Sequence, residues 1–148
     1  MNVGIFLTYG MSLKKWREIG ILDRELEVYK SLSKKVSYTI FSYGSDDQSY
    51  IKNKRIKIIH LNKYFFFKNK YLKFINSLFI PFFLKNKIKN FDILKSNQTL
   101  GSWLPAICSV LYNKKFIHRA GYDLFQNNLD ASYRGAVSLF FFKYFINL

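Results

Sequence analysis

Apolar residues follow two patterns along the chain, short continuous runs and longer stretches spaced three or four apart. The short runs, bounded by glycine or polar turns, predict strands buried in a parallel sheet. The spaced stretches predict helices that pack one side on that sheet. The predicted strands are Val3–Thr8, Val36–Ser42, Ile56–Leu61, Asp92–Ser96 and a strand from Phe116 to the turn at Gly121. The predicted helices are Leu22–Lys34, Tyr64–Asn90 (kinked or divided near Pro81), Gly101–Tyr112 and Ser132–Leu148.

Strands and helices alternate except between Val36–Ser42 and Ile56–Leu61, where two strands follow each other. This order predicts an α/β protein with a Rossmann-like, doubly wound and mainly parallel sheet that carries helices on both faces. The stretch Asp92–Phe125 is the clearest unit, because strand, helix and strand within about thirty residues form a crossover of a parallel sheet. The predicted buried face of its helix is Trp103, Leu104, Ile107, Val110 and Leu111. No repeat or linker divides the 148 residues, so we expect residues 1–148 to form one domain.

Basic residues give the chain a formal net charge of +15, and they are concentrated in its middle. Residues 51–95 contain twelve Lys or Arg against a single acid, Asp92. Such a concentration attracts anionic partners such as lipid headgroups, nucleic acid or phosphorylated substrates. Lys, Asn, Ile, Phe and Tyr are abundant throughout, so AT-rich codon usage is an alternative explanation that the sequence leaves open.

The single cysteine, Cys108, excludes an internal disulfide and suits a reducing compartment. Its position on the apolar side of a helix predicts a core residue. No apolar run approaches the roughly 20 residues of a membrane span, and no basic leader precedes the first strand. We therefore expect a cytoplasmic protein that does not cross a membrane.

Several familiar site motifs are missing. The glycines after the first strand, Gly10 and Gly20, do not fit the dinucleotide fingerprint, and neither a P-loop nor a serine elbow occurs. His60 and His118 lie in predicted strands without metal-ligand spacing, and each is expected to be a satisfied strand residue. These observations argue against NAD or ATP chemistry, and we expect no cofactor and no metal.

Polar and aromatic residues gather after the predicted strands instead. One cluster is Gly10, Ser12, Trp16, Gly20, Arg24 and Glu25, and the other is Asn97, Gln98, Gly101, Ser102, Trp103, Arg119, Ala120, Gly121, Tyr122 and Asp123. Both should meet at the carboxyl edge of the sheet, where such folds bind ligands. Amides, hydroxyls, charges and aromatic faces together suit a sugar. The alternatives are a capped helix with Trp16 as packing, and turn chemistry around Asn97 and Asp123.

Three segments carry a family resemblance that covers essentially the whole chain. IFLTYGMSLKKWREIGILDREL, FDILKSNQTLGSW and FIHRAGYDLF resemble the amino-terminal half of a family 4 glycosyltransferase of the GT-B fold. The resemblance implies the acceptor-side domain of an enzyme that moves sugar from a nucleotide-sugar donor to a glycan or lipid-linked acceptor. It also implies a second, donor-binding domain across a cleft. The acceptor contacts we assign are Gly10, Ser12, Trp16, Arg24, Asn97, Gln98, Arg119, Tyr122 and Asp123.

The chain departs from that family in two respects. Many relatives carry a histidine directly before the glycine of the last turn, where this chain has Ala120, so a histidine role there is not transferred and His118 does not replace it. No catalytic base is assigned, and Asp123 is the first carboxylate to test. The sequence also ends at Leu148 without a donor domain, and we expect no sugar transfer by the chain alone, because a closed cleft must align the reactants.

Two other functions remain open. The basic, aromatic segment Lys63–Lys89 is either a patch that binds the anionic inner face of the cytoplasmic membrane or a core helix with a solvated basic side. With a membrane patch, the chain is alternatively a non-enzymatic scaffold that recruits a separate donor-domain partner. Nucleic-acid binding through Lys52–Lys89 is the least favoured function, because no known module for it occurs.

Overall fold

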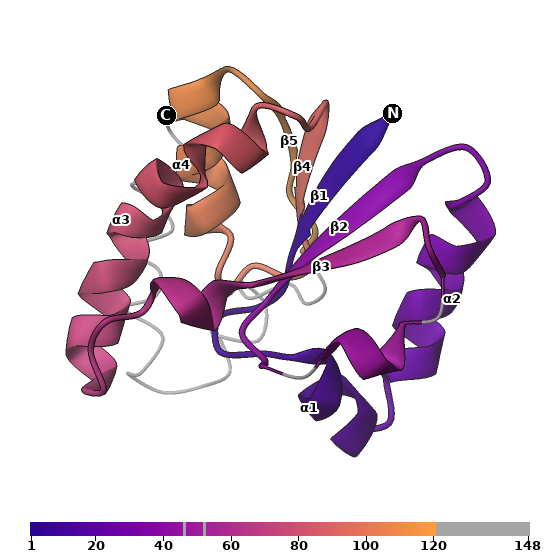
Figure 1. The fold of residues 1–148 in the computed structure, drawn as a ribbon, viewed down its shortest axis with the longest axis horizontal. Helices are drawn as coiled ribbons and strands as arrows, with labels where there is room; N and C mark the ends of the chain where they lie inside the picture. Colours follow the sequence, from indigo (N-terminus) through magenta and orange to yellow (C-terminus); the bar gives the residue numbers. More distant parts are fainter. Residues whose placement is uncertain (46, 52, 121–148) are drawn as a thin grey trace, which may run out of the picture.

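The computed structural model describes residues 1–45, 47–51 and 53–120. At its centre is a five-stranded, all-parallel sheet with the strand order β3-β2-β1-β4-β5 (Figure 1). The strands are β1 (Asn2–Phe6), β2 (Ser37–Ser42), β3 (Ile56–His60), β4 (Ile93–Ser96) and β5 (Lys115–Ile117). The predicted α/β class with a Rossmann-like parallel sheet is therefore confirmed.

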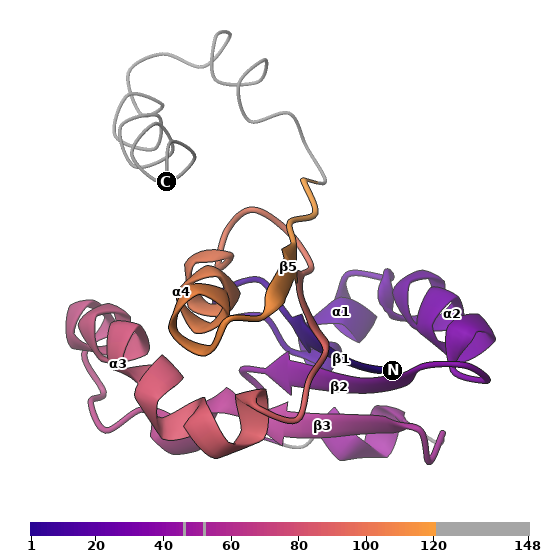
Figure 2. The same ribbon diagram turned by 90° about the horizontal axis from the view of Figure 1, so that it is seen from above.

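Helices cover both faces of the sheet (Figure 2). The helices on one face are α1 (Leu13–Glu18) and α2 (Leu22–Leu32), with the short 3-10 helix η1 (Asp47–Tyr50). The elements on the other face are the 3-10 helix η2 (Leu61–Tyr64), α3 (Lys70–Ile88) and α4 (Trp103–Tyr112). Of the predicted helices, Ser132–Leu148 lies outside the described residues.

Alternation along the strands divides the buried side chains into two cores. In β1, Val3 and Ile5 face α1 and α2, whereas Phe6 faces α3 and α4. The second core is aromatic at its centre, since Phe6 stacks on Phe41 with ring centroids 4.1 Å apart. Gly4 lies beside that pair, where a Cβ would come within 3.2 Å of Phe41. Burial on both faces explains why the strands appear in the sequence as continuous apolar runs.

Helix α3 is not divided at Pro81, contrary to one form of the prediction, because α3 continues from Lys70 to Ile88 with the proline inside it. Proline has no N–H to donate to the preceding turn. Side chains around the proline supply polar contacts: Trp103 Nε1 donates to Ser77 Oγ at 3.3 Å, and Tyr112 Oη donates to the Pro81 carbonyl at 2.9 Å. Side chains of α4 thus form hydrogen bonds with α3 at the turn where Pro81 interrupts the backbone hydrogen bonding of α3.

The buried face of α4 differs from the predicted one. Leu104, Pro105 and Cys108 are buried, whereas Val110 is 83% exposed and Leu111 is 45% exposed. The prediction was wrong for these two residues because all sides of this helix are apolar, so spacing alone did not fix the packed side. The core position of Cys108 is confirmed, and burial raises the pKa of its thiol to about 12.

The topology marks one point on the carboxyl edge. β1 lies between β2 and β4, and the chain leaves β1 toward α1 on one face but leaves β4 toward α4 on the other. The loops after β1 and β4 therefore diverge from a shared origin. Open α/β sheets bind ligands at such a switch point.

Candidate functional site

The loops after β1 and β4 contact each other directly at the switch point. Thr8 Oγ1 donates to Gln98 Oε1 at 3.1 Å, and the Tyr9 amide donates to the Leu100 carbonyl at 3.3 Å. Both Thr8 and Gln98 are half-buried, so the hydroxyl and amide also reach the surface. The edge therefore presents a small, preformed set of uncharged hydrogen-bonding groups.

Gly101 permits this close approach. Its φ is +98°, and a Cβ there would lie 2.6 Å from the Tyr9 nitrogen. Gly10 has a φ of +74°, but no atom lies within 4 Å of the position that a Cβ would occupy there. Glycine is needed at both residues for the backbone angle, and at Gly101 it is also needed for space.

An ion pair with a buried glutamate and a partly exposed arginine joins α2 to the end of β5. Arg119 Nη1 lies 2.6 Å from Glu25 Oε2, and Arg119 Nη2 lies 3.3 Å from Glu25 Oε1. The Glu25 side chain is 8% exposed, whereas that of Arg119 is 42% exposed. Arg119 Nη1 also donates to Asn97 Oδ1 at 3.3 Å, and its amide donates to Ser96 Oγ at 3.2 Å. Arg119 therefore ties α2, β4 and β5 together and keeps part of its guanidinium at the surface.

The charges in this network shift one another's pKa. Burial disfavours the charged form of Glu25, but hydrogen bonds and charge from Arg119, aided by Arg24, outweigh it and lower the pKa of Glu25. Burial lowers the pKa of Lys95, and the nearby charge of Arg119 lowers it further. Burial, then the Glu25 carboxylate, raises the pKa of Tyr29 to about 12. At neutral pH the site is thus an ionised pair with a neutral phenol beside it.

Aromatic rings form a second group on the other side of the switch point. Tyr9 contacts four rings, with centroid distances of 5.2 Å to Tyr43, 6.4 Å to Phe65, 6.1 Å to Phe74 and 5.2 Å to Trp103. Tyr9 and Trp103 are half-buried. These two rings therefore reach the surface close to the polar contacts between the loops.

The structure brings together some of the residues predicted for the site. Asn97, Gln98 and Arg119 lie at the carboxyl edge, and Arg24 reaches the same network because its Nη2 lies 3.3 Å from Glu25 Oε1. Asn97 is only 2% exposed, so its amide positions Arg119 instead of facing a ligand. Gly10 lies in the loop that contacts Gln98 and Leu100 through Thr8 and Tyr9.

Other predicted residues have structural roles. Ser12 is the N-cap of α1, where its Oγ accepts from the Lys15 amide at 3.1 Å. Trp16 is 1% exposed and packs in the core beneath α1 and α2, so the packing role that the sequence left open describes it, and its ring presents no face to a ligand. Tyr122 and Asp123 lie outside the described residues.

Neither histidine is placed as a metal ligand. His60 Nδ1 lies 2.8 Å from the Gly44 carbonyl, as expected for a satisfied strand residue. His118 Nδ1 lies 3.1 Å from Ser96 Oγ, and burial lowers the pKa of His118. Within the described ranges, no three His, Cys, Asp or Glu side chains gather as metal ligands would.

Sequence reasoning missed Tyr9 and the Lys95–Tyr29 contact, in which Lys95 Nζ lies 5.1 Å from the Tyr29 ring centroid. No local motif marks either, since each depends on residues far apart in the chain. The fold and the edge together define a Rossmann-like α/β domain with a polar and aromatic switch point. A search of protein-family models and of curated proteins finds no match to this chain.

Proposed function

We propose that this chain is the acceptor-binding half of a glycosyltransferase, with a sugar of the acceptor bound at the switch point. One observation carries the proposal: half-exposed Thr8, Gln98 and Arg119 lie at the carboxyl edge with the partly exposed rings of Tyr9 and Trp103 beside the same loops. Planar amide and guanidinium groups suit sugar hydroxyls, and aromatic faces suit the apolar side of a pyranose.

The electrostatics of the edge support a neutral ligand with many hydroxyls. Glu25 neutralises Arg119 through two contacts, and the half-buried groups at the loop contact, Thr8 and Gln98, are uncharged. A glycan meets such groups through hydrogen bonds alone. A donor carrying a diphosphate would need more positive charge or a free helix N-terminus, so we assign nucleotide-sugar binding to a separate donor domain.

A second candidate is a non-enzymatic scaffold half that holds a donor-domain partner at a membrane surface. Its supporting observation is the exposed apolar side of α3, where Phe79 is 55% exposed and Phe82 is 60% exposed. The two candidates differ in whether the switch point binds sugar.

Saturation-transfer NMR with methyl glycosides of glucose, galactose, mannose and N-acetylglucosamine tests the proposal. We expect at least one glycoside to receive saturation from the wild-type chain, and Gln98→Ala to abolish the transfer because it removes the exposed amide. Lys34→Ala, an exposed change beyond the end of α2, is the matched control and should retain full transfer. Absence of transfer to every glycoside would rule out the acceptor role and leave the scaffold.

A further inference from the structure

Helix α3 carries apolar residues on all its sides although only one side packs on the sheet. Ile80, Leu84 and Ile88 are fully buried against the strands and α4. The outward residues, each at least 40% exposed, are Tyr71, Leu72, Phe74, Ile75, Leu78, Phe79, Phe82 and Phe83. A helix with apolar residues all round is typical of one that is covered on every side. The outward side of α3 is therefore typical of a surface that another molecule covers.

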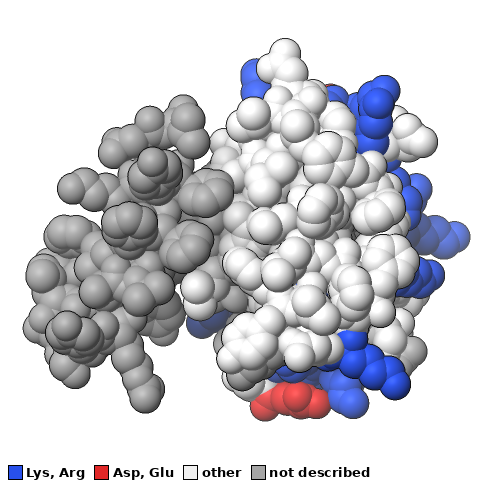
Figure 3. Space-filling model, turned by 90° about the vertical axis from the view of Figure 1, so that its left-hand side faces the viewer, with Lys and Arg blue, Asp and Glu red and all other residues white. Residues whose placement is uncertain are grey.

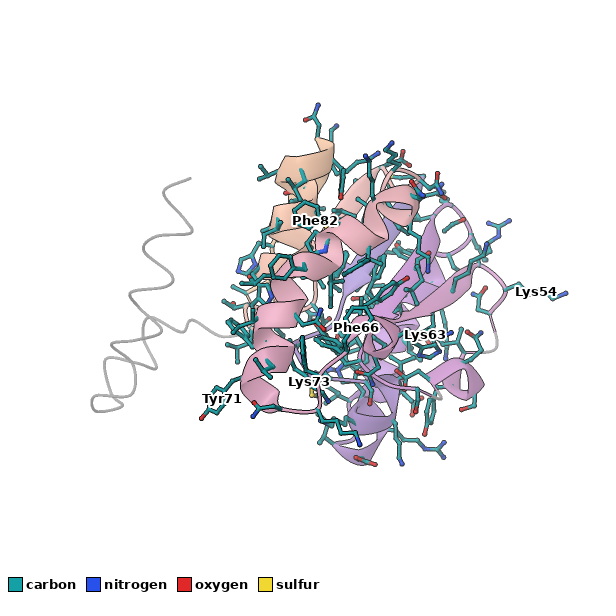
Figure 4. The ribbon with its side chains drawn as sticks, turned by 60° about the vertical axis from the view of Figure 1, so that its left-hand side comes forward. Lys54, Lys63, Phe66, Tyr71, Lys73 and Phe82 are labelled. Carbon is teal, nitrogen blue, oxygen red and sulfur yellow. The ribbon has the colours of Figure 1, made fainter. Side chains whose placement is uncertain are left out.

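The apolar area extends beyond the helix into the segment that leads to it. Phe66 is 68% exposed, and its ring centroid lies 5.8 Å from that of Phe83 on α3. Figure 4 shows Tyr71 and Phe82 projecting from α3, with Phe66 on the neighbouring segment. We call these nine outward residues, the eight on α3 together with Phe66, the α3 surface.

Exposed lysines lie on the segments that border the α3 surface. The exposed lysines on the segments around it are Lys63, Lys68, Lys85, Lys87 and Lys89. The single acid among residues 51–95 is Asp92, whose carboxylate accepts from the Asn2 amide at 2.7 Å. The side of the molecule in Figure 3 is largely uncharged at its centre, with Lys and Arg around much of its margin and acidic atoms only at its lower edge. An apolar centre with a cationic margin complements an anionic lipid surface.

We propose that the α3 surface docks the chain on a membrane containing anionic lipid, with α3 lying in the plane of the interface. Phe, Leu and Ile side chains would enter the boundary between headgroups and acyl chains, while lysines extend to the lipid phosphates. No helix among the described residues is long and apolar enough to cross a bilayer. Each lysine near the surface strengthens binding by about 1 kcal/mol, or roughly fivefold.

Two other coverings fit the α3 surface less well. A second copy of the chain would bring the same bordering lysines toward one another, which like-charge repulsion opposes. Nucleic-acid interfaces are polar and strongly charged, whereas the α3 surface includes the aliphatic residues Leu72, Ile75 and Leu78. Aliphatic side chains of this kind offer neither hydrogen bonds nor stacking to bases.

The α3 surface also adjoins the switch point. Phe74, which is 41% exposed on α3, contacts Tyr9 of the β1–α1 loop with ring centroids 6.1 Å apart. Docking through α3 would consequently hold the carboxyl edge of the sheet close to the lipid headgroups. The membrane proposal does not depend on sugar binding, because it rests on exposure and charge alone.

Co-sedimentation of the full chain with vesicles tests the proposal. The probes are phosphatidylcholine vesicles and vesicles of phosphatidylcholine mixed with phosphatidylglycerol. We expect binding to the mixed vesicles that weakens as salt rises, because salt screens exposed charges. The double variant Phe79→Asn/Phe82→Asn should lower the partition coefficient by more than about tenfold, since each ring contributes apolar burial. Lys85→Gln/Lys89→Gln should lower it about 25-fold at low salt, since each lysine contributes roughly fivefold.

A matched control lies on the opposite face of the sheet. Val28 and Leu32 of α2 are each 53% exposed, so Val28→Asn/Leu32→Asn makes the same chemical change away from α3 and should leave vesicle binding unchanged. Circular dichroism verifies that each variant folds.

Three results would overturn the proposal. The first is no binding of the wild-type chain to mixed vesicles, and the second is equal binding by Phe79→Asn/Phe82→Asn. The third concerns the same variant with its vesicle binding intact. The variant would have lost either a dimer that sedimentation equilibrium detects in the wild-type chain, or the wild-type chain's binding to a single-stranded oligonucleotide. That last outcome would assign the α3 surface to a second copy or to nucleic acid.

Discussion

At the scale of single residues, the contact between Arg119 and Glu25 connects parts of the chain that are 94 positions apart. Glu25 is almost fully buried, and Arg119 is the partner that satisfies both of its oxygens. The sequence placed both residues near the carboxyl edge but contained no indication that they pair. Pairing across that separation depends on how α2 and β5 pack, which no local pattern encodes.

This asymmetry in burial predicts unequal effects of removing the two partners. Arg119→Met leaves a buried carboxylate whose remaining hydrogen-bonded cation is the exposed Arg24, and should cost about 2 kcal/mol of unfolding free energy at pH 7. Glu25→Gln leaves a half-exposed arginine that water can solvate and should cost about 1 kcal/mol. Urea unfolding at pH 7 measures both. Arg24→Gln, at a side chain that is 74% exposed, is the control and should change stability by less than about 0.5 kcal/mol.

The same pair predicts a pH dependence. Because the folded pKa of Glu25 is lowered, its stabilisation is present above the unfolded pKa of about 4.3 and is lost as pH falls through the folded value. Without Arg119, burial raises the pKa of Glu25, so protonation would instead remove the free-energy cost of burying an ionised carboxylate. The stability difference between wild type and Arg119→Met should thus shrink on acidification from pH 7 to about pH 4. A difference that grows on acidification would contradict the proposed role of the ion pair.

At the scale of elements, the sequence predicted the five strands, because burial on two faces produces continuous apolar runs, and it predicted the helices α2, α3 and α4. It did not predict α1 as a helix. It was less successful where a helix is apolar all round. In α4 the packed side was misplaced, and in α3 the outward residues had no separate signal. Periodicity identifies a packed side only when the other side is polar, and neither helix meets that condition.

The contact between the two switch-point loops predicts different costs for two glycine substitutions. Gly101→Ala combines a left-handed backbone with a Cβ placed 2.6 Å from the Tyr9 nitrogen, and should cost about 3 kcal/mol. Gly10→Ala changes only the strain of the left-handed backbone, because no atom lies within 4 Å of the added Cβ. This substitution should cost about 1 kcal/mol of unfolding free energy. Thermal unfolding of both variants measures the difference. Equal costs would mean that the two loops do not approach each other this closely.

At the scale of the whole molecule, the switch point and the α3 surface lie next to each other and meet through Tyr9 and Phe74. The sequence predicted that polar residues collect at the carboxyl edge, and Asn97, Gln98 and Arg119 do lie there. It did not identify which of them reach solvent, because exposure follows from packing between elements. Trp16 illustrates this, since the sequence left open whether it packs or binds, and in α1 its ring is enclosed in the core.

Amide chemical-shift mapping locates a bound sugar on the molecule, and the acceptor proposal depends on that location. A labelled sample is titrated with whichever methyl glycoside receives saturation from it. We predict that the shifted amides cluster at Tyr9, Gly10, Gln98 and Gly101, on the two loops that meet at the switch point. Shifts confined to α3, or spread over both faces without a cluster at these loops, would contradict an acceptor site at the carboxyl edge.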